Sequence, residues 1–380
     1  MNLPSSFAIS LCVACCLTVT GCKDDKNASS EEESSGMKVM TPALIKEHKQ
    51  KALEEADLPP IAESAPTRFP ARKGQKWGYI DREGNLAIEV QYEDADDFYE
   101  GLAAVKVNGL FGYIDGHGEW AIEPQFSKAG RFSEGLAAVR PDGKDKLGFV
   151  DRAGKMVIPA QFTWYIWAEK SRFGDGLAPV RDRDKENVPE GAAGDWGYID
   201  TTGEWAIAPQ FDRGMPFSEG LAPAGITSDE TAFIDTDGNV VLEGDWKTAH
   251  PFSEGLAAVA RRSNTATLQW HYIDKEGDTA VMPVFGEQRD STPPAKALPF
   301  SEGLGAIYHD GAQRWEFIEP VPHGTAADYT KLGPYIKYKD ASPFRGGLAR
   351  VKAFNLRDRQ TPAYTRDIDR KGNQIWPKGD

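Results

Sequence analysis

The sequence predicts an all-β protein, built as a tandem array of about seven three-stranded antiparallel β units behind a short N-terminal helix. Three observations support this fold class. A phrase of about 35 residues recurs from residue 77 to the carboxyl end. Each copy alternates apolar and polar residues with a period of two, as strands do, and turns containing glycine divide it. One copy has too few apolar side chains to bury both faces of three strands, so neighbouring copies must stack.

The first half of each copy predicts a β-hairpin. In "WGYIDREG", which begins at Trp77, the alternating strand ends at an aspartate, and a glycine follows three residues later. Aspartate at the first position of a turn accepts hydrogen bonds from the amides that follow it, and glycine suits the last position of a type I turn. The aspartates of the copies that obey this rule are Asp81, Asp115, Asp151, Asp200, Asp235, Asp274 and Asp369.

The second half of each copy predicts a tight turn and a third strand. The phrase "FSEGLAAV" at 132–139 returns several times with an acid, a glycine and a leucine in the same order. Glycine supplies a backbone conformation that is costly for other residues, and the acid before it hydrogen-bonds turn amides. A series of calcium ligands is the alternative, but calcium needs six to eight clustered oxygens and each copy has one acid. We therefore favour a turn-forming role for Glu100, Glu134, Asp175, Glu219, Glu254 and Glu302.

At these residues the chain resembles the bacterial WG-repeat family, named for a Trp-Gly pair that is seen here as Trp77-Gly78 and Trp196-Gly197. The resemblance implies an all-β repeat domain over residues 67–380. It implies no catalytic residue, since the family has none in common. Other copies replace the tryptophan with Phe111, Leu147, Ala232 or His271.

The ends of the chain decide whether the array is open or closed. The segment before Trp77 has the outline of a third strand, and the carboxyl end supplies only a hairpin, "DIDRKGNQIWP". We favour an open, curved or spiral stack, because unequal insertions and a degraded seventh copy fit it without rotational symmetry. A closed, propeller-like ring completed by the two ends is the alternative.

The first 66 residues predict a signal peptide and a tether. Residues 1–21 contain no charged side chain, and their apolar stretch is too short for a comfortable membrane span, as in a secretory signal peptide. The stretch "VTGC" resembles the lipobox of bacterial lipoproteins, which implies cleavage before Cys22 and lipid attachment to it. Residues 22–66 are acidic and Ser-rich, as a tether is, with a short helix over about 42–57.

Lipid attachment at Cys22 implies a protein held on a membrane of the cell envelope. The other cysteines, Cys12, Cys15 and Cys16, lie in the signal peptide, so the mature chain has no pair for a disulfide. Lys23 follows Cys22, where an aspartate would signal retention in the inner membrane. The resemblance therefore favours the outer membrane, with the chain facing the periplasm, and surface exposure is the alternative.

Charge and motifs argue against several classes of function. The formal net charge is -14, which repels the backbone of a nucleic acid. The histidines stand singly, without the spacing of metal ligands, and the motifs of serine hydrolases, zinc proteases and phosphate loops are absent. We therefore expect no catalytic residue, no metal, no cofactor and no enzymatic activity. Carboxylates paired across a groove, as in a glycosidase, stay open as an alternative.

The favoured function is a lipid-anchored binding scaffold of the envelope, with proteins or glycans as partners. Trp164, Tyr165 and Trp167 lie together outside the repeat pattern, as rings that bind a sugar or a partner protein would. Packing of these rings against a neighbouring unit explains them equally well. A glycan-binding or glycan-cleaving protein and a purely structural spacer are the other hypotheses.

Overall fold

The computed structural model divides the chain into two units, Met1–Lys38 and Val39–Asp380. The structure describes residues 67–163, 171–182, 194–262, 268–281, 296–309, 314–320, 329–331, 338–353 and 364–377, all of them in the second unit. The expected signal peptide, the tether and the helix over about 42–57 lie outside the described residues. Within the described ranges the regular structure is β-strand, and no helix there is long and apolar enough to cross a membrane.

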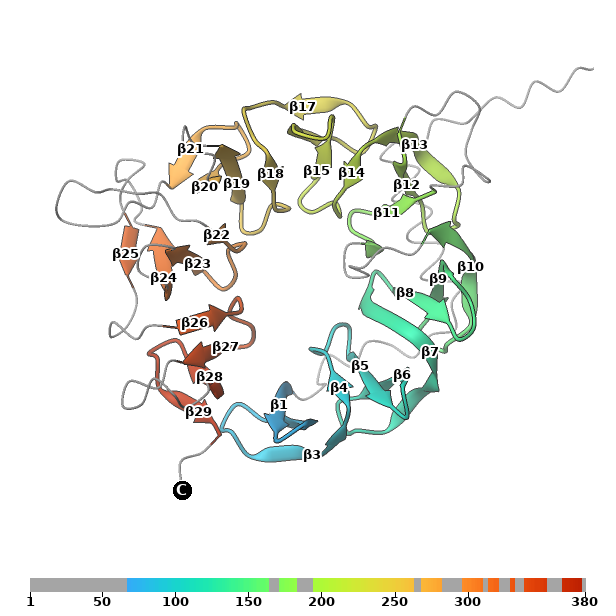
Figure 1. Ribbon diagram of the computed structural model, residues 1–380, viewed down its shortest axis with the longest axis vertical. Coiled ribbons are helices and arrows are strands. Elements are labelled where there is room, and N and C mark those ends of the chain that lie inside the picture. The colour runs from blue at the N-terminus through green and yellow to red at the C-terminus, as the bar shows by residue number, and fades with distance from the viewer. Residues whose placement is uncertain are drawn as a thin grey trace, which may run out of the picture. The chain divides into compact units, whose positions relative to one another are not determined.

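The strands form antiparallel sheets, called blades here, that follow one another around a circle (Figure 1). The long strand β7 joins blades 2 and 3 in one seven-stranded sheet. Pairing of Trp315 with Tyr338 joins blades 7 and 8 in one eight-stranded sheet. When each joined sheet is divided into two blades, the described residues form eight blades. The prediction of an all-β fold is confirmed.

The first four blades contain the longer outer strands. Blade 1 has β1 (Phe69–Lys73), β2 (Lys76–Ile80) and β3 (Leu86–Tyr92), and blade 2 has β4 (Asp94–Ala95), β5 (Leu102–Val107), β6 (Leu110–Asp115) and the first part of β7 (Trp120–Ser133). Blade 3 has the rest of β7, β8 (Leu136–Pro141), β9 (Lys146–Asp151) and β10 (Met156–Thr163). Blade 4 has β11 (Ala178–Arg181), β12 (Trp196–Ile199) and β13 (Trp205–Phe211).

The last four blades have shorter outer strands. Blade 5 has β14 (Arg213–Gly214), β15 (Ala222–Gly225), β16 (Thr231–Ile234) and β17 (Val240–Leu242). Blade 6 has β18 (Thr248–Ala249), β19 (Ala257–Arg262), β20 (Leu268–Ile273) and β21 (Thr279–Val281). Blade 7 has β22 (Lys296–Ala297), β23 (Gly305–His309), β24 (Arg314–Pro320) and β25 (Tyr329–Lys331). Blade 8 has β26 (Tyr338–Ala341), β27 (Leu348–Ala353), β28 (Tyr364–Asp369) and β29 (Gln374–Trp376).

Each sequence repeat spans two blades. The hairpin β2–β3 completes blade 1, whereas the next strands of the same repeat, β4 and β5, open blade 2. The prediction of three-stranded units is wrong for most blades, because a short inner strand such as β4 precedes the strand made by "LAAV". An inner strand of two residues is too short to produce a period-two pattern, so the sequence gives no sign of it.

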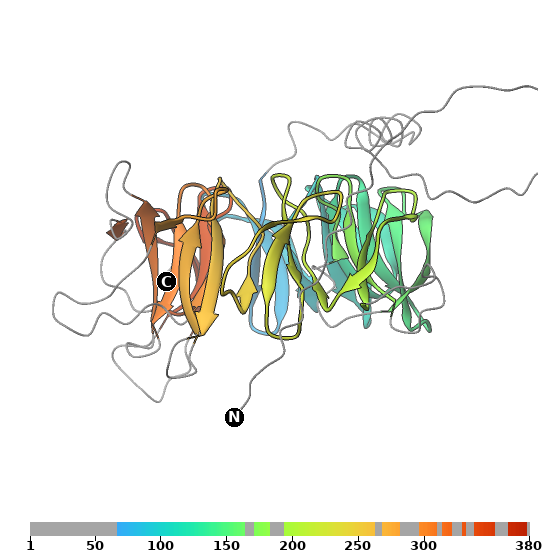
Figure 2. The ribbon, with the colours of Figure 1, turned by 90° about the horizontal axis from the view of Figure 1, so that it is seen from above.

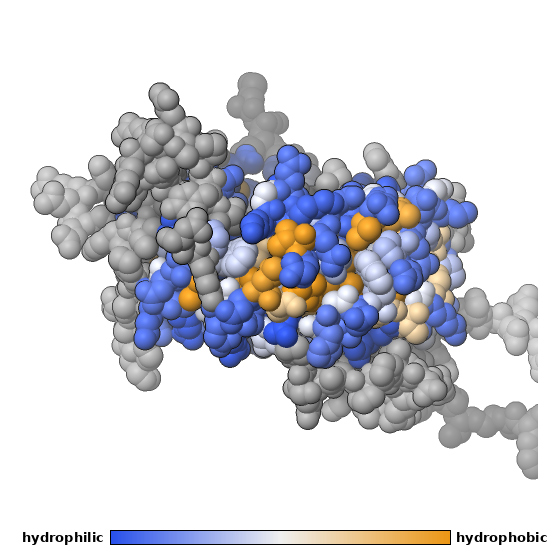
Figure 3. Space-filling model, turned by 90° about the horizontal axis from the view of Figure 1, so that it is seen from below, coloured by the Kyte–Doolittle hydropathy of each residue, from blue (hydrophilic) through white to orange (hydrophobic). Residues whose placement is uncertain are grey.

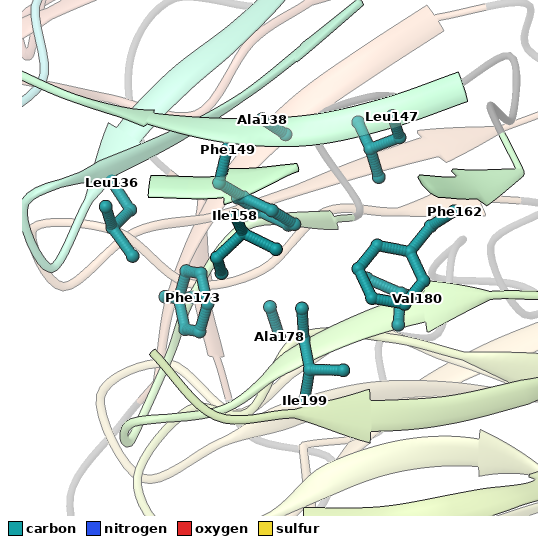
Figure 4. Packing of buried hydrophobic residues seen from close by; sticks show 10 residues of the cluster. All are labelled: Leu136, Ala138, Leu147, Phe149, Ile158, Phe162, Phe173, Ala178, Val180 and Ile199. Carbon is teal, nitrogen blue, oxygen red and sulfur yellow. The ribbon is translucent and has the colours of Figure 1, made fainter. Parts of the chain in front are cut away.

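The hydrophobic core is divided among the interfaces between blades. The interface of blades 3 and 4 is an example, in which Phe149 and Ile158 of one blade pack against Phe173, Ala178 and Ile199 of the next (Figure 4). Similar clusters of buried residues fill the other interfaces. Because each described cluster takes its residues from two blades, we expect that one repeat would not fold alone.

The open stack favoured from the sequence is wrong, because blade 8 packs against blade 1. Phe69, Ala71 and Ile80 of blade 1 form a buried cluster with Leu348 of blade 8. At Gly84 of blade 1 a Cβ atom would lie 2.5 Å from the carbonyl oxygen of Ile375 in blade 8. The alternative, a closed propeller-like ring, is the arrangement that these contacts make. Closure buries apolar faces that an open stack would leave exposed at both ends.

The two edges of the ring differ. Since neighbouring strands are antiparallel, all Glu-Gly and Asp-x-x-Gly turns lie at one edge, the turn edge, and the connections β5–β6 and β3–β4 lie at the other, the insertion edge. Figure 2 shows the strands running between these edges. Of the internal ranges that interrupt the described residues, only 321–328 follows a strand end at the turn edge. The ranges 164–170, 183–193, 263–267, 282–295, 310–313, 332–337 and 354–363 all follow strand ends at the insertion edge.

Candidate functional site

The Asp-x-x-Gly turns have the hydrogen bonds that the sequence predicts. The Oδ1 atom of Asp115 accepts hydrogen bonds from the backbone N–H groups of His117 and Glu119, at 2.9 and 3.0 Å. Asp81 also accepts a hydrogen bond from the Asn85 side chain. Partial desolvation opposes ionisation of Asp81, but these hydrogen bonds prevail and lower its pKa. The repeated aspartates are therefore engaged within their own turns.

The acids of the Glu-Gly and Asp-Gly turns bind the neighbouring blade instead of their own turn. Each acid has a φ between 51° and 58°, and the glycine after it has a φ between 76° and 88°. The pair therefore forms the corner of a tight hairpin. The carboxylate accepts a hydrogen bond from the glycine N–H of the next turn, over 2.8–3.1 Å. The links join Glu100 to Gly135, Glu134 to Gly176, Asp175 to Gly220, Glu219 to Gly255, Glu254 to Gly303 and Glu302 to Gly347.

These links assign a structural role to the acids of the turn edge. A left-handed conformation costs a non-glycine residue about 1–2 kcal/mol, and the charge-assisted hydrogen bond offsets that cost. Within the described ranges no three His, Cys, Asp or Glu side chains lie close enough to hold a metal ion. The turn edge is therefore a belt of contacts between blades.

Buried tyrosines make a second link between blades. The Tyr113 hydroxyl donates a hydrogen bond to the Gly130 carbonyl of the next blade, at 2.7 Å, and Phe132 packs edge-on against the Tyr113 ring at 4.8 Å. Burial raises the pKa of Tyr113 well above its usual value, so the hydroxyl remains a donor. Equivalent hydroxyl bonds are made by Tyr79, Tyr198 and Tyr272.

The glycine of the Trp-Gly pair lies beneath a bulge of the outer strand. A Cβ atom at Gly112 would lie 2.5 Å from the Ile122 carbonyl oxygen, where the pairing of β6 with β7 shifts register. Strand pairing places Ala232 and His271 at this glycine position, so the sequence comparison that put them in the tryptophan position is wrong. In those two blades the outer strands β17 and β21 end after three residues, before the bulge.

A pocket lies at the insertion edge of blades 4, 5 and 6. Its volume is about 190 Å³, and Trp196, Arg213, Met215 and Thr231 are among the residues that line it. The Arg213 guanidinium donates hydrogen bonds to the Thr231 hydroxyl and the Lys247 carbonyl, at 3.3 and 3.2 Å. The pocket thus combines an aromatic ring, a thioether and a positioned cation, which suits a polar group attached to an apolar body.

A second pocket, here called the seam pocket, lies where blade 8 meets blade 1. Its volume is about 280 Å³, and it is lined on the blade 1 side by Phe69 and Pro70. Arg350 and Asp367 of blade 8 line the opposite side. Arg345, also from blade 8, reaches Asp97 of blade 2 at 3.9 Å. Charged side chains line the pocket beside apolar ones, unlike the apolar interfaces between the other blades.

At the seam an ion pair stands where the other repeats of this chain have a small residue packed beside an aromatic one. Arg350 pairs with Asp367 across β27 and β28, in the register that joins Ala104 to Tyr113 in blade 2. Nε of Arg350 lies 3.3 Å from Oδ1 of Asp367. Burial raises the pKa of Asp367 to about 6, and neighbouring Arg350 opposes the shift without cancelling it. The seam therefore has a titratable group in place of a buried aromatic ring.

The Arg345 side chain closes the turn edge above the seam pocket. Its guanidinium lies 4.6 Å from the centre of the Tyr99 ring, and Arg131 lies 4.2 Å from the same ring. Both distances are those of cation–π contacts. Arg345 and Tyr99 stand where most copies have a serine, so this contact between blades 8 and 2 is specific to the seam.

The outer rim has exposed apolar side chains distributed over several blades. Leu86, Trp120, Val157 and Val241 are between 36% and 47% exposed, and they belong to different outer strands. Figure 3 shows apolar groups on one side of the rim, separated by hydrophilic ones. Part of this surface is used between blades, since the Trp120 ring lies 6.3 Å from that of Tyr92.

The residues singled out from the sequence as binding sites fall outside the described residues. This applies to Cys22, the expected site of lipid attachment, and to Trp164, Tyr165 and Trp167. The described strand that precedes these residues in the sequence, β10, ends at Thr163, at the insertion edge. Sequence reasoning missed Arg350 and Asp367, although the last copy reads "TRDID" where the first reads "WGYID".

Several solved structures are similar to this chain at low sequence identity. One is BamB from Moraxella catarrhalis, at 12% identity and a TM-score of 0.42, over 75% of this chain and 93% of that one. Another is Hsv2p from Kluyveromyces lactis, at 8% identity and a TM-score of 0.41, over 67% of this chain and 89% of that one. The WD40 domain of coronin from Toxoplasma gondii matches at 10% identity and a TM-score of 0.37, over 82% of this chain and 85% of that one. These likenesses carry no argument about function.

A family match defines the repeats independently of the fold. The family described as "WG containing repeat" matches residues 77–111, 111–144, 148–185, 196–225, 232–261 and 335–353. No curated protein matches the chain. The matched segments begin or end within blades 1–6 and 8 of the ring. The chain therefore carries WG-containing repeats, arranged as a propeller-like scaffold.

Proposed function

We propose that the protein is a lipid-anchored scaffold of the bacterial cell envelope, without enzymatic activity, that binds an envelope protein or glycan through its insertion edge. The observation that supports this proposal most is the distribution of the insertions, nearly all of which follow strand ends at that edge. Loops held by a rigid scaffold commonly carry recognition, because their sequence varies without disturbing the core. The turn edge, in contrast, uses its acids between blades.

The pocket of blades 4–6 marks the part of the insertion edge that we expect to contact the partner. Arg213 and Trp196 line it, and the segment with Trp164, Tyr165 and Trp167 follows β10 at the same edge of the neighbouring blade. Aromatic and arginine side chains contribute much of the binding free energy at protein interfaces. Glycans also bind aromatic faces, so a glycan is the second partner class.

Photo-cross-linking in living cells tests the choice of edge. A cross-linking amino acid is placed at Ile226, which is 39% exposed in the β15–β16 connection at the insertion edge. The matched control is Asp237, exposed in the β16–β17 turn at the other end of the same blade. We expect a specific adduct from position 226 and none from position 237. Adducts from position 237 alone would contradict the proposal.

The aromatic segment is tested with the same cells. The double variant Trp164→Ala/Trp167→Ala should lose the position 226 adduct, whereas Trp120→Ala, a change at the outer rim, should keep it. An adduct that survives the double variant would reject these rings as part of the site. A glycan partner would give no protein adduct but a sugar-containing one, which mass spectrometry distinguishes.

Membrane attachment through Cys22 is tested separately. Cells fed a labelled fatty acid should incorporate it into the wild-type chain, and the Cys22→Ser variant should lose the label and leave the outer-membrane fraction. Control labelling of a Cys16→Ser variant should be unchanged. Label retained in Cys22→Ser would contradict the proposed anchor.

A further inference from the structure

The seam pocket lies at the edge of β1 where blades 2, 3, 5, 6, 7 and 8 have an inner strand. In blade 2 the Ala104 carbonyl accepts a hydrogen bond from the Asp96 N–H of the inner strand, at 2.9 Å. Pro70 pairs with Tyr79 as Ala104 pairs with Tyr113, so Pro70 holds the corresponding position in β1. The bonds equivalent to that of Ala104 are accepted by Pro223, Ala258, Ala306 and Arg350 in blades 5, 6, 7 and 8.

At the seam an arginine takes the place of that backbone donor. The Arg350 guanidinium donates a hydrogen bond to the Pro70 carbonyl. Among the described residues, β1 has β2 on one side and no strand on the other. The seam pocket thus lies at the position that an inner strand takes in blade 2, a position that no described strand occupies, and Pro70 presents a carbonyl there that a strand could use.

The walls of this position select a polar occupant. In the interfaces between the other blades, a phenylalanine that lies shortly before the Glu-Gly or Asp-Gly corner packs edge-on or tilted against an aromatic ring of the blade before, as Phe98 does against Tyr79 at 4.8 Å. At the seam the corresponding ring is absent, and Asp367 stands in its place beside Arg350. A phenylalanine would bury the ion pair against an apolar ring, whereas a small polar side chain would hydrogen-bond to it.

The sequence directly before Thr67 has these properties. Counted back from Phe69 in the register of blade 2, Ser64 falls at the position of Phe98, so the aromatic residue is missing from both sides of the seam. Ala62 falls at the position of Asp96 and has an N–H group to donate. Ile61 falls at the position of Ala95, which packs against an apolar cluster.

We propose that the seam pocket is the docking site for residues 60–66 of this chain, which would complete blade 1 as its inner strand. The described chain begins at Thr67, and a Cβ atom on Gly346, at the turn edge of blade 8, would lie 3.0 Å from Thr67 Cγ2. Because residues 60–66 directly precede Thr67 in the chain, their effective concentration at the pocket is high. On docking, the Pro70 carbonyl would accept a hydrogen bond from the Ala62 N–H in place of the one from Arg350. Arg350 remains paired with Asp367.

Disulfide trapping in the full chain tests this docking. Ala95 pairs with Val105 in blade 2, so the register places Ile61 opposite Ala71. The native cysteines all lie within residues 1–22, so the pair Ile61→Cys/Ala71→Cys is identified without ambiguity by peptide mapping. We expect mild oxidation to close this disulfide, with loss of maleimide labelling at both positions. The matched pair Ser34→Cys/Ala71→Cys should stay reduced.

Three results would overturn the proposal. One is equal reactivity of the two cysteine pairs. Another is a disulfide between two copies of the chain, which would assign the pocket to a second molecule. The third comes from a separate measurement.

Since Ala71 is buried, hydrogen exchange of the wild-type protein provides a test without substitution. It should show at least tenfold slower exchange at the Ala62 amide than at the amides of residues 24–35, and equal exchange would contradict docking. Neither measurement involves a partner, so both are independent of the proposed function.

Discussion

The glycine of the Trp-Gly pair has no Cβ atom, and its absence lets a long outer strand pack directly against the strand beneath it. Where the glycine is present, as at Gly112, the outer strand bulges within contact distance of the strand beneath it. Where the position holds Ala232 or His271, the outer strand has three residues. The repeat motif is thus a packing requirement between two strands of one blade, and its loss in later copies shortens those blades without interrupting the ring.

Substitution of this glycine tests the packing requirement. Gly112→Ala should lower the free energy of unfolding by about 1–3 kcal/mol, because its Cβ would overlap the Ile122 carbonyl and displace β7. The control is Ala232→Gly at the equivalent position of blade 5, where the loss should be about 0.5–1 kcal/mol from chain entropy alone. Urea denaturation measures both values. Equal losses would contradict a specific role for the bulge.

Asp367 gives the seam a pH dependence with a definite sign. Its pKa is raised to about 6 in the folded chain, from a usual 3.8, so between these values the folded state binds more protons than the unfolded state. The wild-type protein should lose stability relative to Asp367→Asn as the pH rises from about 4 to about 7, by on the order of 2–3 kcal/mol. Thermal unfolding of both proteins across this range measures the difference. A constant difference would show that the carboxyl group titrates normally.

At the scale of elements, a small set of contacts recurs between neighbouring blades. From blade 2 around to blade 8, a carboxylate at the turn edge binds the next turn. A tyrosine hydroxyl binds the backbone of the next blade from blades 1, 2, 4 and 6. A phenylalanine packs on the aromatic ring at the tyrosine position, which is itself a phenylalanine in blades 3, 5 and 7. The seam between blades 8 and 1 lacks all three among the described residues. Gly346 stands in place of the acid, Asp367 in place of the aromatic ring, and the Arg345 contact with Asp97 passes to blade 2.

Removal of one carboxylate tests the belt of links. Glu100 accepts hydrogen bonds from two backbone N–H groups of the next turn, at 2.6 and 2.9 Å, so Glu100→Ala leaves two donors without it. The free energy of unfolding should fall by about 1–3 kcal/mol. Glu83→Ala, which removes an exposed acid from a turn at the same edge, should change it by less than about 0.5 kcal/mol. A loss at Glu100 as small as that at Glu83 would contradict a linking role.

Sequence reasoning recovered what depends on neighbours in the chain. The hairpins were predictable because Asp115 and Gly118 form their turn within four residues. The inner strands were not, because two residues carry no periodicity, and the partner of Glu100 was not, because it lies in another blade. The sequence shows Asp367 in place of a tyrosine, in "TRDID" against "WGYID", but strand pairing is needed to show that Arg350 lies opposite it in place of a small residue.

At the scale of the whole molecule, closure of the ring buries the apolar faces of blades 1 and 8 against each other and so shields them from water. The contact of Gly84 with Ile375 joins residues from opposite ends of the array, and the cluster around Phe69 and Leu348 is the smallest of the interblade cores. A ring closed by a small, polar interface has its weakest point at the seam. We therefore expect unfolding to begin there, with the amides of β1 and β29 exchanging before those of β6 and β8. Hydrogen exchange measured by mass spectrometry gives this order, and earlier exchange in β6 would contradict it.

Closure of the ring is tested most directly by a distance between its two ends. Glu83, His117 and Lys371 are exposed at the same position of the Asp-x-x-Gly turns in blades 1, 2 and 8. Spin labels on cysteines at 83 and 371 should give the same dipolar distance as labels at 83 and 117, because both pairs then belong to adjacent blades. A 83–371 distance much longer than the 83–117 distance would mean that the array is open.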